Sequence, residues 1–305
     1  MNLTDQKFAI RIPASSANLG PGFDSMGVAL DLYLDLEVET SEHWECYSRT
    51  IELQEFPTDD RNFICQIAIQ TAKKYGKELA PCRIVVDSDI PLARGLGSSA
   101  AAIVAGIELA NYVGDLELTQ KEKLLLATEI EGHPDNVGAS LYGGLVIGSY
   151  QNNEVDILSM ADIPMEMVAV IPQEILLTKE SRGVLPTDFS YPEAVQASST
   201  ANLLVAALLC QNWELAGKMM DRDRFHQPYR KPLIPFYQEI DDVAKDSGAF
   251  GIALSGAGPT VLCFCELGKG KELANVLEGA FPDMKVKLVN IDSTGSSVKK
   301  CEKCL

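Results

Sequence analysis

The sequence predicts an α+β fold, and three patterns in the chain support this prediction. Residues 8–12 and 28–40 alternate apolar and polar side chains, which is typical of half-buried β-strands. Residues 62–75 instead place apolar side chains at helical spacing. A short apolar run at 83–86 leads through a glycine-containing loop into an apolar helix at 100–112, as in a βαβ unit. Helices and strands thus alternate in part of the chain, whereas elsewhere they form separate runs.

The composition indicates a globular protein and argues against nucleic acid or an anionic membrane as a partner. A length of 305 residues suffices for one large or two modest domains, and 46% hydrophobic with 23% charged residues is ordinary for such proteins. A net charge of −17 repels polyanions. A single nucleotide can still bind, because screening over about 8 Å leaves local dipoles, cations and metal ions to decide its affinity.

Two further observations concern the location of the protein. The chain has no apolar run of transmembrane length, and residues 1–7 are polar, unlike a signal peptide. We therefore expect a cytoplasmic protein. The Cys-x-x-Cys pair of Cys301 and Cys304 lies in a lysine-rich tail without a partner pair, which favours a frayed terminus over a zinc site.

Residues 91–101 form the stretch on which the functional argument depends. They read Pro-Leu-Ala-Arg-Gly-Leu-Gly-Ser-Ser-Ala-Ala and join the predicted strand to the predicted helix. Glycine lets the backbone approach a ligand closely, and the unsatisfied N–H groups of a helix N-terminus favour phosphate. A glycine turn followed by a serine N-cap would explain the same residues without a ligand. Because no lysine follows the glycines, the stretch is not a Walker A loop.

The same stretch resembles the ATP-binding loop of the GHMP kinases, a family of small-molecule kinases. This resemblance implies that ATP is the co-substrate. It also implies a contact near the adenine from an asparagine at the start of the helix predicted at 62–75. The implied ATP-binding residues are Pro91, Leu92, Ala93, Arg94, Gly95, Leu96, Gly97, Ser98, Ser99, Ala100, Ala101 and Asn62.

The segment from Ala14 to Gly27 is dense in glycine, proline, serine and asparagine, which predicts an ordered loop. A simple connector would account for this composition. The segment is long for a connector, however, and it carries an amide and a carboxylate. It resembles the N-terminal signature of the homoserine kinases within the GHMP group. The resemblance implies that Asn18 and Asp24 contact an amino-acid substrate, with Asp24 facing its ammonium group.

Residues 131–138 read Glu-Gly-His-Pro-Asp-Asn-Val-Gly. Glycine ends a helix, proline begins the next and aspartate suits its first turn, so these three residues need no functional explanation. In the GHMP kinases a glutamate in this region binds Mg²⁺, and an Asp or Asn beyond it points at the hydroxyl that is phosphorylated. The resemblance implies that Ser99 and Glu131 hold Mg²⁺. It also implies that Asn136 and the adjacent Asp135 form the catalytic pair.

Two arginines of the C-terminal half are candidates for binding a carboxylate. In so acidic a chain an arginine is most often a solvated partner of Asp or Glu. A substrate carboxylate nevertheless suits a fork-shaped cation, which arginine provides and lysine does not. Residues 178–182 and 226–230 resemble the stretches that bind the substrate carboxylate in homoserine kinases. The implied substrate contacts are Thr178, Arg182 and Arg230.

The string at 251–260 resembles the third GHMP motif, a glycine loop that closes against the phosphate loop, and it adds Gly256 to the substrate site. The family architecture implies an N-terminal ATP-loop domain with a mixed sheet at 1–160 and a C-terminal ferredoxin-like α/β domain at 161–295. We expect a flexible tail at 296–305.

The three motifs span residues 13–260, so the resemblance covers nearly the whole chain. It implies transfer of the γ-phosphate of ATP to the side-chain hydroxyl of L-homoserine, giving O-phospho-L-homoserine in threonine biosynthesis. The implied partners are these small molecules and a second copy of the chain in a homodimer. Two alternatives stay open: a GHMP kinase acting on another small acid or alcohol such as mevalonate, and a non-catalytic nucleotide-binding member of the fold.

Overall fold

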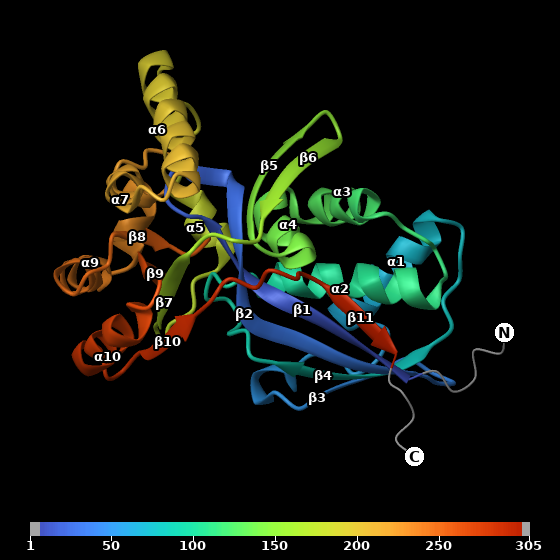
Figure 1. The fold of residues 1–305 in the computed structure, drawn as a ribbon. Helices are drawn as coiled ribbons and strands as arrows, with labels where there is room; N and C mark the ends of the chain where they lie inside the picture. The colour runs from blue at the N-terminus through green and yellow to red at the C-terminus, as the bar shows by residue number, and fades with distance from the viewer. Residues whose placement is uncertain (1–6, 301–305) are drawn as a thin grey trace.

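The computed structural model describes residues 7–300, and two β-sheets define its architecture (Figure 1). In the first sheet β11, β1, β2, β4 and β3 are neighbours in that order, and β5 joins β2 to β6. The second sheet has the order β10, β7, β9, β8. Helices accompany both sheets, so the predicted α+β fold is confirmed.

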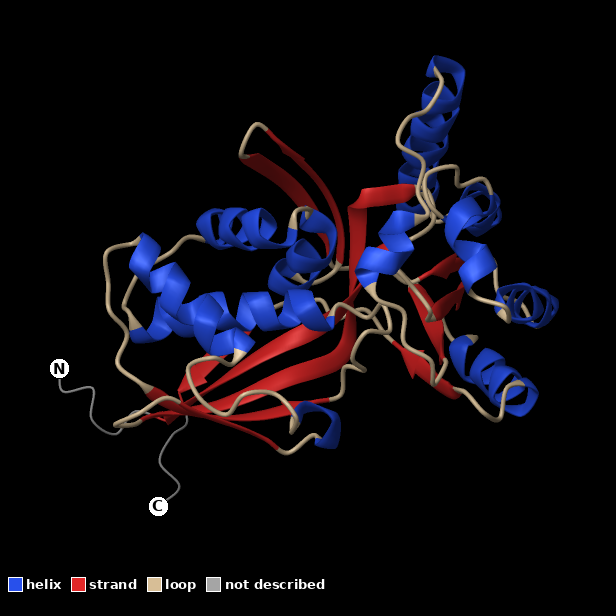
Figure 2. Cartoon of the chain, turned by 180° about the vertical axis from the view of Figure 1, so that it is seen from behind, coloured by secondary structure: helices blue, strands red, loops and turns tan. Residues whose placement is uncertain are grey.

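The first sheet is mixed and carries its helices on one face (Figure 2). Its strands are β1 (Lys7–Asn18), β2 (Gly22–Thr40), β3 (Glu45–Ser48), β4 (Cys82–Ser88), β5 (Leu145–Gln151), β6 (Glu154–Met160) and β11 (Ser297–Lys300). Only β3 and β4 pair in parallel. Its helices are α1 (Phe63–Lys74), α2 (Ser98–Val113), α3 (Gln120–Glu131) and α4 (Pro134–Tyr142), and the short 3₁₀ helix η1 is Ile51–Leu53. Thr119 and Glu122 have the spacing of a capping box, and both of its hydrogen bonds are present at the start of α3.

The segment predicted as an ordered loop at 14–27 is instead mostly a continuation of two strands. β1 extends to Asn18, and β2 begins four residues later. The pairing of β1 with β2 shifts register after Pro13 and after Ala17. Such bulges bend a strand and redirect its side chains. Its glycines and serines therefore mark bulges and a tight turn, where Asn18 and Leu19 have φ of 74° and 46°.

The second sheet follows the βαββαβ pattern of ferredoxin-like folds. Its strands are β7 (Met165–Ile171), β8 (Gly251–Leu254), β9 (Val261–Glu266) and β10 (Lys285–Val289), all antiparallel. The helices of this part are α5 (Thr178–Gly183), α6 (Tyr191–Leu209), α7 (Trp213–Asp221), α8 (Gln227–Arg230), α9 (Tyr237–Asp246) and α10 (Gly270–Ala280), with the 3₁₀ helix η2 at Lys231–Leu233.

The two faces of β7 explain how the halves of the molecule are joined. Met167 and Ala169 belong to a large hydrophobic cluster that also includes Ile10 of β1. Val168 and Val170, which point to the opposite face, belong to a second cluster beneath α9 and α10. The second sheet is thus buried on both faces, and one continuous core connects it to the first sheet.

The helix α6 is the most exposed long element and projects from the body of the molecule (Figure 1). Its buried residues are Ala197, Leu204, Ala207 and Leu208, whereas Tyr191 at its start is 84% exposed. Within residues 7–300, no helix combines the length and the apolar character needed to cross a bilayer.

The C-terminal segment corrects the expected flexible tail at 296–305. Residues 297–300 form β11, which pairs antiparallel with β1, for example Val298 opposite Ile10. Ser296 before it donates a hydrogen bond to the buried Glu108 at 2.8 Å. The lysine-rich composition suggested a tail, but alternation around Val298 lets the strand complete the edge of the sheet. Cys301 and Cys304 lie outside the described residues.

Candidate active site

Most of the residues predicted to form the site converge on one cavity of about 90 Å³. Its wall comes from segments far apart in the sequence: the end of β1 and the start of β2, the β4–α2 loop, the α3–α4 junction, α5, α8 and the β8–β9 turn. The predicted residues that line it are Asn18, Asp24, Ala93, Gly95, Gly97, Ser98, Ser99, Glu131, Asp135, Asn136, Thr178, Arg182, Arg230 and Gly256. The fold therefore brings together residues that the sequence connected only through family resemblance.

Several of the predicted ATP-binding residues instead hold the loop in place. The side chains of Leu96, Ala100 and Ala101 are buried in the large hydrophobic cluster. Arg94 donates hydrogen bonds to the backbone carbonyl oxygens of Leu92, Pro172 and Gln173, at 3.0, 3.0 and 2.8 Å. These four side chains are therefore structural, because they anchor the loop to the core and to the segment after β7.

The loop before α2 is shaped for backbone contact with a ligand. Gly95 and Gly97 have φ of 78° and 73°, and a side chain on either would collide with Ser255 or Ser15, respectively. Ser255 Oγ donates to the Gly95 carbonyl at 2.6 Å, so the β8–β9 turn closes against this loop. The N-cap of α2 is Gly97, which supplies no side-chain hydrogen bond, and Ser98 is already helical. The serine N-cap considered above is therefore absent, and the first amides of α2 are available to an anion.

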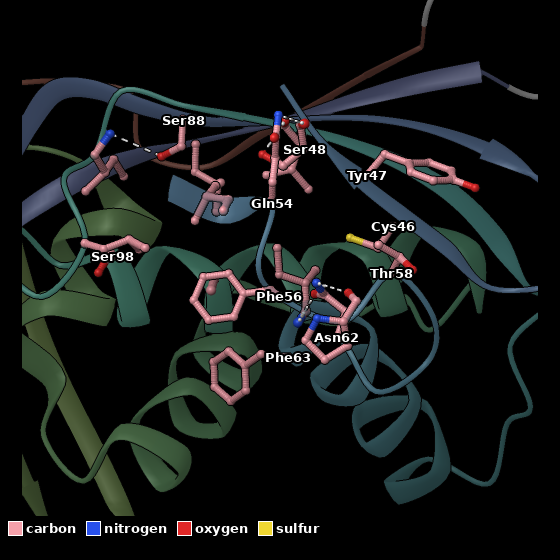
Figure 3. Close-up of a pocket in the computed structure, with 18 of the residues that line it drawn as sticks. Cys46, Tyr47, Ser48, Gln54, Phe56, Thr58, Asn62, Phe63, Ser88 and Ser98 are labelled. Atoms are coloured by element: carbon pink, nitrogen blue, oxygen red, sulfur yellow. Dashed lines mark hydrogen bonds between the residues drawn. The ribbon is translucent and has the colours of Figure 1, made fainter. Parts of the chain in front are cut away.

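A second cavity of about 500 Å³ adjoins the first (Figure 3). Phe56 and Phe63 contribute aromatic rings to its wall, and Ser98 and Ser99 line both cavities. Asn62 also lines it, while its Oδ1 accepts a hydrogen bond of 3.1 Å from the first turn of α1. The N-terminus of α2 therefore lies between the two cavities. The second cavity, which we call the apolar chamber, is on one side of it, and the polar cavity is on the other.

Sequence analysis identified only a few residues of this second cavity, among them Asn62 and Leu92. Much of its wall comes from residues 46–58, which have no periodic pattern. The available signal was the presence of Ile51, Leu53 and Phe56 in a largely polar segment. The predicted residues that line neither of the two cavities are Pro91, Arg94, Leu96, Ala100 and Ala101.

Glu131 lies next to Ser99, as predicted for a metal-binding pair. Ser99 Oγ is 3.5 Å from Glu131 Oε2, and no Lys, Arg or His forms an ion pair with this carboxylate among residues 7–300. Burial raises the pKa of Glu131, and the charge of Asp135 adds to this, while His133 and Arg182 act in the opposite direction. A desolvated carboxylate beside a hydroxyl fits a hard divalent cation such as Mg²⁺.

One carboxylate oxygen of Asp135 has hydrogen-bond partners, and the other has none among the described residues. Its Oδ1 contacts His133 Nδ1 at 2.6 Å and accepts the backbone N–H of Asn136 at 2.7 Å. Its Oδ2 is buried and has no hydrogen-bond partner among the described residues, although the residue lines the cavity. Burial acts to lower the pKa of His133, but Asp135, Asp24 and Glu131 outweigh it and raise that pKa. The free oxygen is suited to a hydrogen-bond donor on a ligand.

The two predicted arginines differ in their partners. Arg182 forms a bidentate ion pair with Asp24, at 2.7 and 3.2 Å. Arg230 is 2% exposed and donates to the carbonyl oxygens of Ser181 and Gly256, at 3.2 and 3.0 Å. It has no ion pair with any carboxylate in the described part of the chain. Burial, together with the charge of Arg182, lowers the pKa of Arg230 to about 10. The cavity thus contains a buried cation that lacks an anion.

Asn18 shapes the cavity through contacts within the protein. Its Nδ2 donates to the Gly256 carbonyl at 3.1 Å, and its Oδ1 accepts the backbone N–H of Asp24 at 3.0 Å. Asp24 itself has φ of 54°, a conformation that a non-glycine residue rarely adopts. Such strain is found where the surrounding structure holds a functional side chain in a set position.

Sequence analysis gave no role to Phe23, which also lines the cavity. The guanidinium carbons of Arg182 and Arg230 lie 5.5 and 5.2 Å from its ring centroid. The ring of His226 stacks on Phe23 at 5.5 Å. The His226-x-x-x-Arg230 spacing was visible in the sequence and would have indicated a contact across one helical turn.

Comparisons with known proteins agree with this geometry. The family profile of the GHMP kinases N terminal domain matches residues 62–144, and that of the GHMP kinases C terminal matches residues 204–283. A homoserine kinase from Bacillus licheniformis is 50% identical over 300 residues, 98% of each chain. One from Shouchella clausii is 50% identical over 292 residues, 95% of this chain and 98% of that one.

A solved structure supports the same assignment. The crystal structure of a homoserine kinase from Cytophaga hutchinsonii has a TM-score of 0.86 and 25% identity, covering 98% of this chain and 99% of that one. The match extends over both sheets and both family profiles. The chain therefore belongs to the GHMP kinase family, in the group of its homoserine kinases.

Proposed function

We propose that this enzyme transfers the γ-phosphate of ATP to the side-chain hydroxyl of L-homoserine, giving ADP and O-phospho-L-homoserine. The observation that carries the substrate assignment is Arg230. This guanidinium is buried at the cavity wall without a carboxylate partner among residues 7–300. An unpaired buried charge is costly, and a bidentate carboxylate from a ligand would offset that cost.

The neighbouring ion pair supports an amino acid over a simple acid. A zwitterion can bring its carboxylate to the two arginines and its ammonium to Asp24, so that every charge keeps a partner. A substrate with only a carboxylate, such as mevalonate, would draw Arg182 away from Asp24 and leave that aspartate uncompensated. The charge pattern therefore favours homoserine over the mevalonate alternative.

The arrangement of the two cavities supports a nucleotide that spans them. The apolar chamber with Phe56 and Phe63 suits a flat, aromatic base, and the polar cavity suits the reacting groups. The phosphates would lie at the junction where the two cavities meet. Ser98 and Ser99 line both cavities there, and the first backbone amides of α2 are at the same place. Phosphoryl transfer depends mainly on alignment and charge neutralisation, which this junction offers.

Glu131 and Ser99 would hold Mg²⁺. When bound, the ion supplies charge neutralisation for the phosphates. The carboxylate of Glu131 would offer it a desolvated oxygen, and the Ser99 hydroxyl would offer a second oxygen ligand. Both side chains lie at the same cavity as Arg182, so the cation and the amino acid would occupy neighbouring positions.

Asp135 and Asn136 would hold the acceptor hydroxyl. The buried, unpartnered Oδ2 of Asp135 can accept the hydroxyl hydrogen, while Asn136 is fixed by donating to Ser15 Oγ at 3.0 Å. We expect Asp135→Asn, which keeps the oxygen that binds His133 and changes the free one, to lower kcat more than it raises KM. A change confined to KM would contradict this role.

The test of the function is an ADP-release assay with Mg·ATP and a panel of L-homoserine, mevalonate, galactose and L-serine. We expect turnover with L-homoserine, and much less with L-serine because its hydroxyl lies one carbon closer to the charged groups. Turnover with mevalonate but not homoserine would overturn the assignment of the amino-acid cavity. ATP binding without turnover of any acceptor would favour the non-catalytic alternative.

A further inference from the structure

We propose that Phe23 and His226 are positioning residues that hold the guanidinium groups of Arg182 and Arg230 in place for the substrate carboxylate. The proposal rests on the proposed function, because it concerns how the amino-acid cavity is formed. Neither side chain was assigned a role by sequence analysis. Phe23 lies at the start of β2 and lines the cavity, and His226 lies directly before α8, where the two rings stack.

The first step concerns two like charges in one cavity. Arg182 can share its charge with Asp24, whereas Arg230 has no carboxylate partner in the described structure. Burial and the charge of Arg182 lower the pKa of Arg230 to about 10, as expected for two like charges in one cavity. Asp24 holds Arg182, and the Ser181 and Gly256 carbonyl oxygens hold Arg230, but none of these groups contacts both guanidiniums.

Phe23 contacts both guanidiniums. Its ring centroid lies 5.5 Å from the guanidinium carbon of Arg182 and 5.2 Å from that of Arg230. Both distances fall within the range of a cation–π attraction, and arginine favours such contacts. One aromatic ring thus attracts both cations without neutralising either, so their charge stays available to a carboxylate.

His226 fixes Arg230 from another direction. Its Nδ1 lies 3.3 Å from Arg230 Nη1, and its Nε2 lies 2.9 Å from the carbonyl oxygen of Gly20. A guanidinium only donates, so Nδ1 must accept and Nε2 must carry the hydrogen donated to Gly20. The side chain is 0% exposed, and burial followed by the charge of Arg230 lowers its pKa to about 3, so the ring is neutral at working pH.

His226 therefore joins two parts of the cavity. Its acceptor nitrogen orients Arg230, and its donor nitrogen holds Gly20 in the β1–β2 turn, just before the start of β2 where Phe23 lies. The stacking of His226 on Phe23, at 5.5 Å and 24°, completes the contact. A displacement of either ring would change the distance between the two guanidiniums, and with it the fit to a carboxylate.

The histidine is tested with two variants that separate its two nitrogens. His226→Asn keeps an acceptor near the position of Nδ1, whereas His226→Gln keeps a donor near the position of Nε2. We expect His226→Gln to raise KM for L-homoserine about tenfold, which corresponds to about 1.4 kcal/mol. His226→Asn should raise it less than threefold, and KM for ATP should stay within twofold in both variants. Equal effects of the two variants on KM for homoserine would overturn the role of Nδ1.

The phenylalanine is tested with Phe23→Leu and a matched control. Phe225 also stacks near Phe23, at 6.4 Å, and has no cation–π contact with either arginine, so Phe225→Leu removes a similar apolar ring without the electrostatic contact. We expect Phe23→Leu to raise KM for homoserine about tenfold and Phe225→Leu less than twofold. Equal effects would overturn the proposed attraction.

A carboxylate-free analogue separates positioning from general damage to the cavity. In 2-aminobutane-1,4-diol a CH₂OH group replaces the carboxylate, so its inhibition constant does not depend on the arginines. We expect that constant to change less than twofold in Phe23→Leu and His226→Gln, while KM for homoserine rises. A parallel loss for both ligands would show a merely structural role and overturn the proposal. Absence of homoserine turnover in the unaltered enzyme would instead refute the proposed function itself.

Discussion

The phosphate end and the amino-acid end of the active site are built in different ways. The phosphate end consists of a continuous stretch, in which strand β4, a glycine loop and the start of α2 follow one another within residues 82–99. The amino-acid end combines Asp24, Arg182 and Arg230, which come from three distant parts of the chain. A local site can be recognised from sequence pattern, whereas a site of distant residues depends on the packing of the whole fold.

The two ends also differ in chemistry. The proposed phosphate end would bind through backbone amides and through glycines that allow close approach. The amino-acid end relies on charged side chains that are held by buried contacts, such as those of Arg230 with the Ser181 and Gly256 carbonyls. A substitution at one end should therefore change the kinetics with only one of the two substrates. A substitution where the two ends meet should change the kinetics with both.

The largest difference between the effects on homoserine and on ATP is expected for Arg230→Lys. Lysine cannot form the fork that binds a carboxylate, and it leaves the carbonyl oxygens of Ser181 and Gly256 without their donor. Truncating one partner of a buried charge pair costs about 2–5 kcal/mol, so we expect kcat/KM for homoserine to fall about 10³-fold. KM for ATP should change less than threefold. Steady-state kinetics with each substrate varied checks this, and an equal loss for ATP would contradict this difference.

The next effect is expected where the two ends meet, at Gly95. Alanine there would collide with the Ser255 carbonyl oxygen, so Gly95→Ala should lower the free energy of unfolding by about 2–3 kcal/mol and impair both substrates. Gly76 is the matched control. It has φ of 68°, close to the 78° of Gly95, but no atom lies within 4 Å of an added Cβ.

Gly76→Ala should cost only the strain of a left-handed alanine, about 1–2 kcal/mol, and leave kinetics unchanged. Chemical denaturation of both variants, together with kcat/KM for each substrate, measures the difference. A similar loss in the two variants would mean that the contact between the loops contributes little.

A smaller effect is expected for Glu131→Gln. A neutral amide would bind Mg²⁺ less well than the carboxylate, so the Mg²⁺ concentration for half-maximal rate should rise by at least about tenfold, the loss seen when even a group that only supports a metal ligand is altered. Because the pKa of Glu131 is raised in the folded state, the unaltered protein loses stability as pH rises through that pKa. Without Mg²⁺ and nucleotide, Glu131→Gln should therefore be more stable than the unaltered protein at pH 7 and equal to it below pH 4. Greater stability of the variant at both pH values would contradict ionisation as the cause.

The smallest effect is expected for His133. Its folded-state pKa lies above the ordinary 6.5, so its contribution to stability is complete below that value and is lost as pH rises through the folded pKa. We expect the difference in free energy of unfolding between the unaltered protein and His133→Gln to be larger at pH 5.5 than at pH 8.5. Urea unfolding at the two pH values measures it, and a difference independent of pH would show that the contact with Asp135 is not charge-assisted.

The sequence predicted the phosphate end better than the amino-acid end for physical reasons. The glycines and serines of 91–101 are close together in the sequence and form the site with their own backbone. Their pattern alone therefore indicates a helix N-terminus with room for an anion. For Arg182 and Arg230 the residues themselves favoured a solvated role, and only the family resemblance indicated the site. Burial of Arg230 to 2% exposure results from tertiary packing, which no local pattern encodes.

Other features were missed or misinterpreted because they too depend on tertiary packing. Residues 14–27 have a loop-like composition, yet paired strands give their backbone groups partners, so most of them are extended. The wall of the apolar chamber around Phe56 has no periodicity, because a cavity requires no repeat. Phe23 and His226 acquire their contacts only when the start of β2 meets the residues around α8.

The pairing of β11 with β1 has a consequence for synthesis of the protein. β1 has no partner along this edge until β11 is made, since Phe8 pairs with Lys300. Because chains emerge from the ribosome N-terminus first, this edge of the first sheet stays open until residues 297–300 have been translated. The two ends of the described chain are also adjacent, so a circular permutant that joins them with a short linker and opens the β5–β6 hairpin should keep the fold.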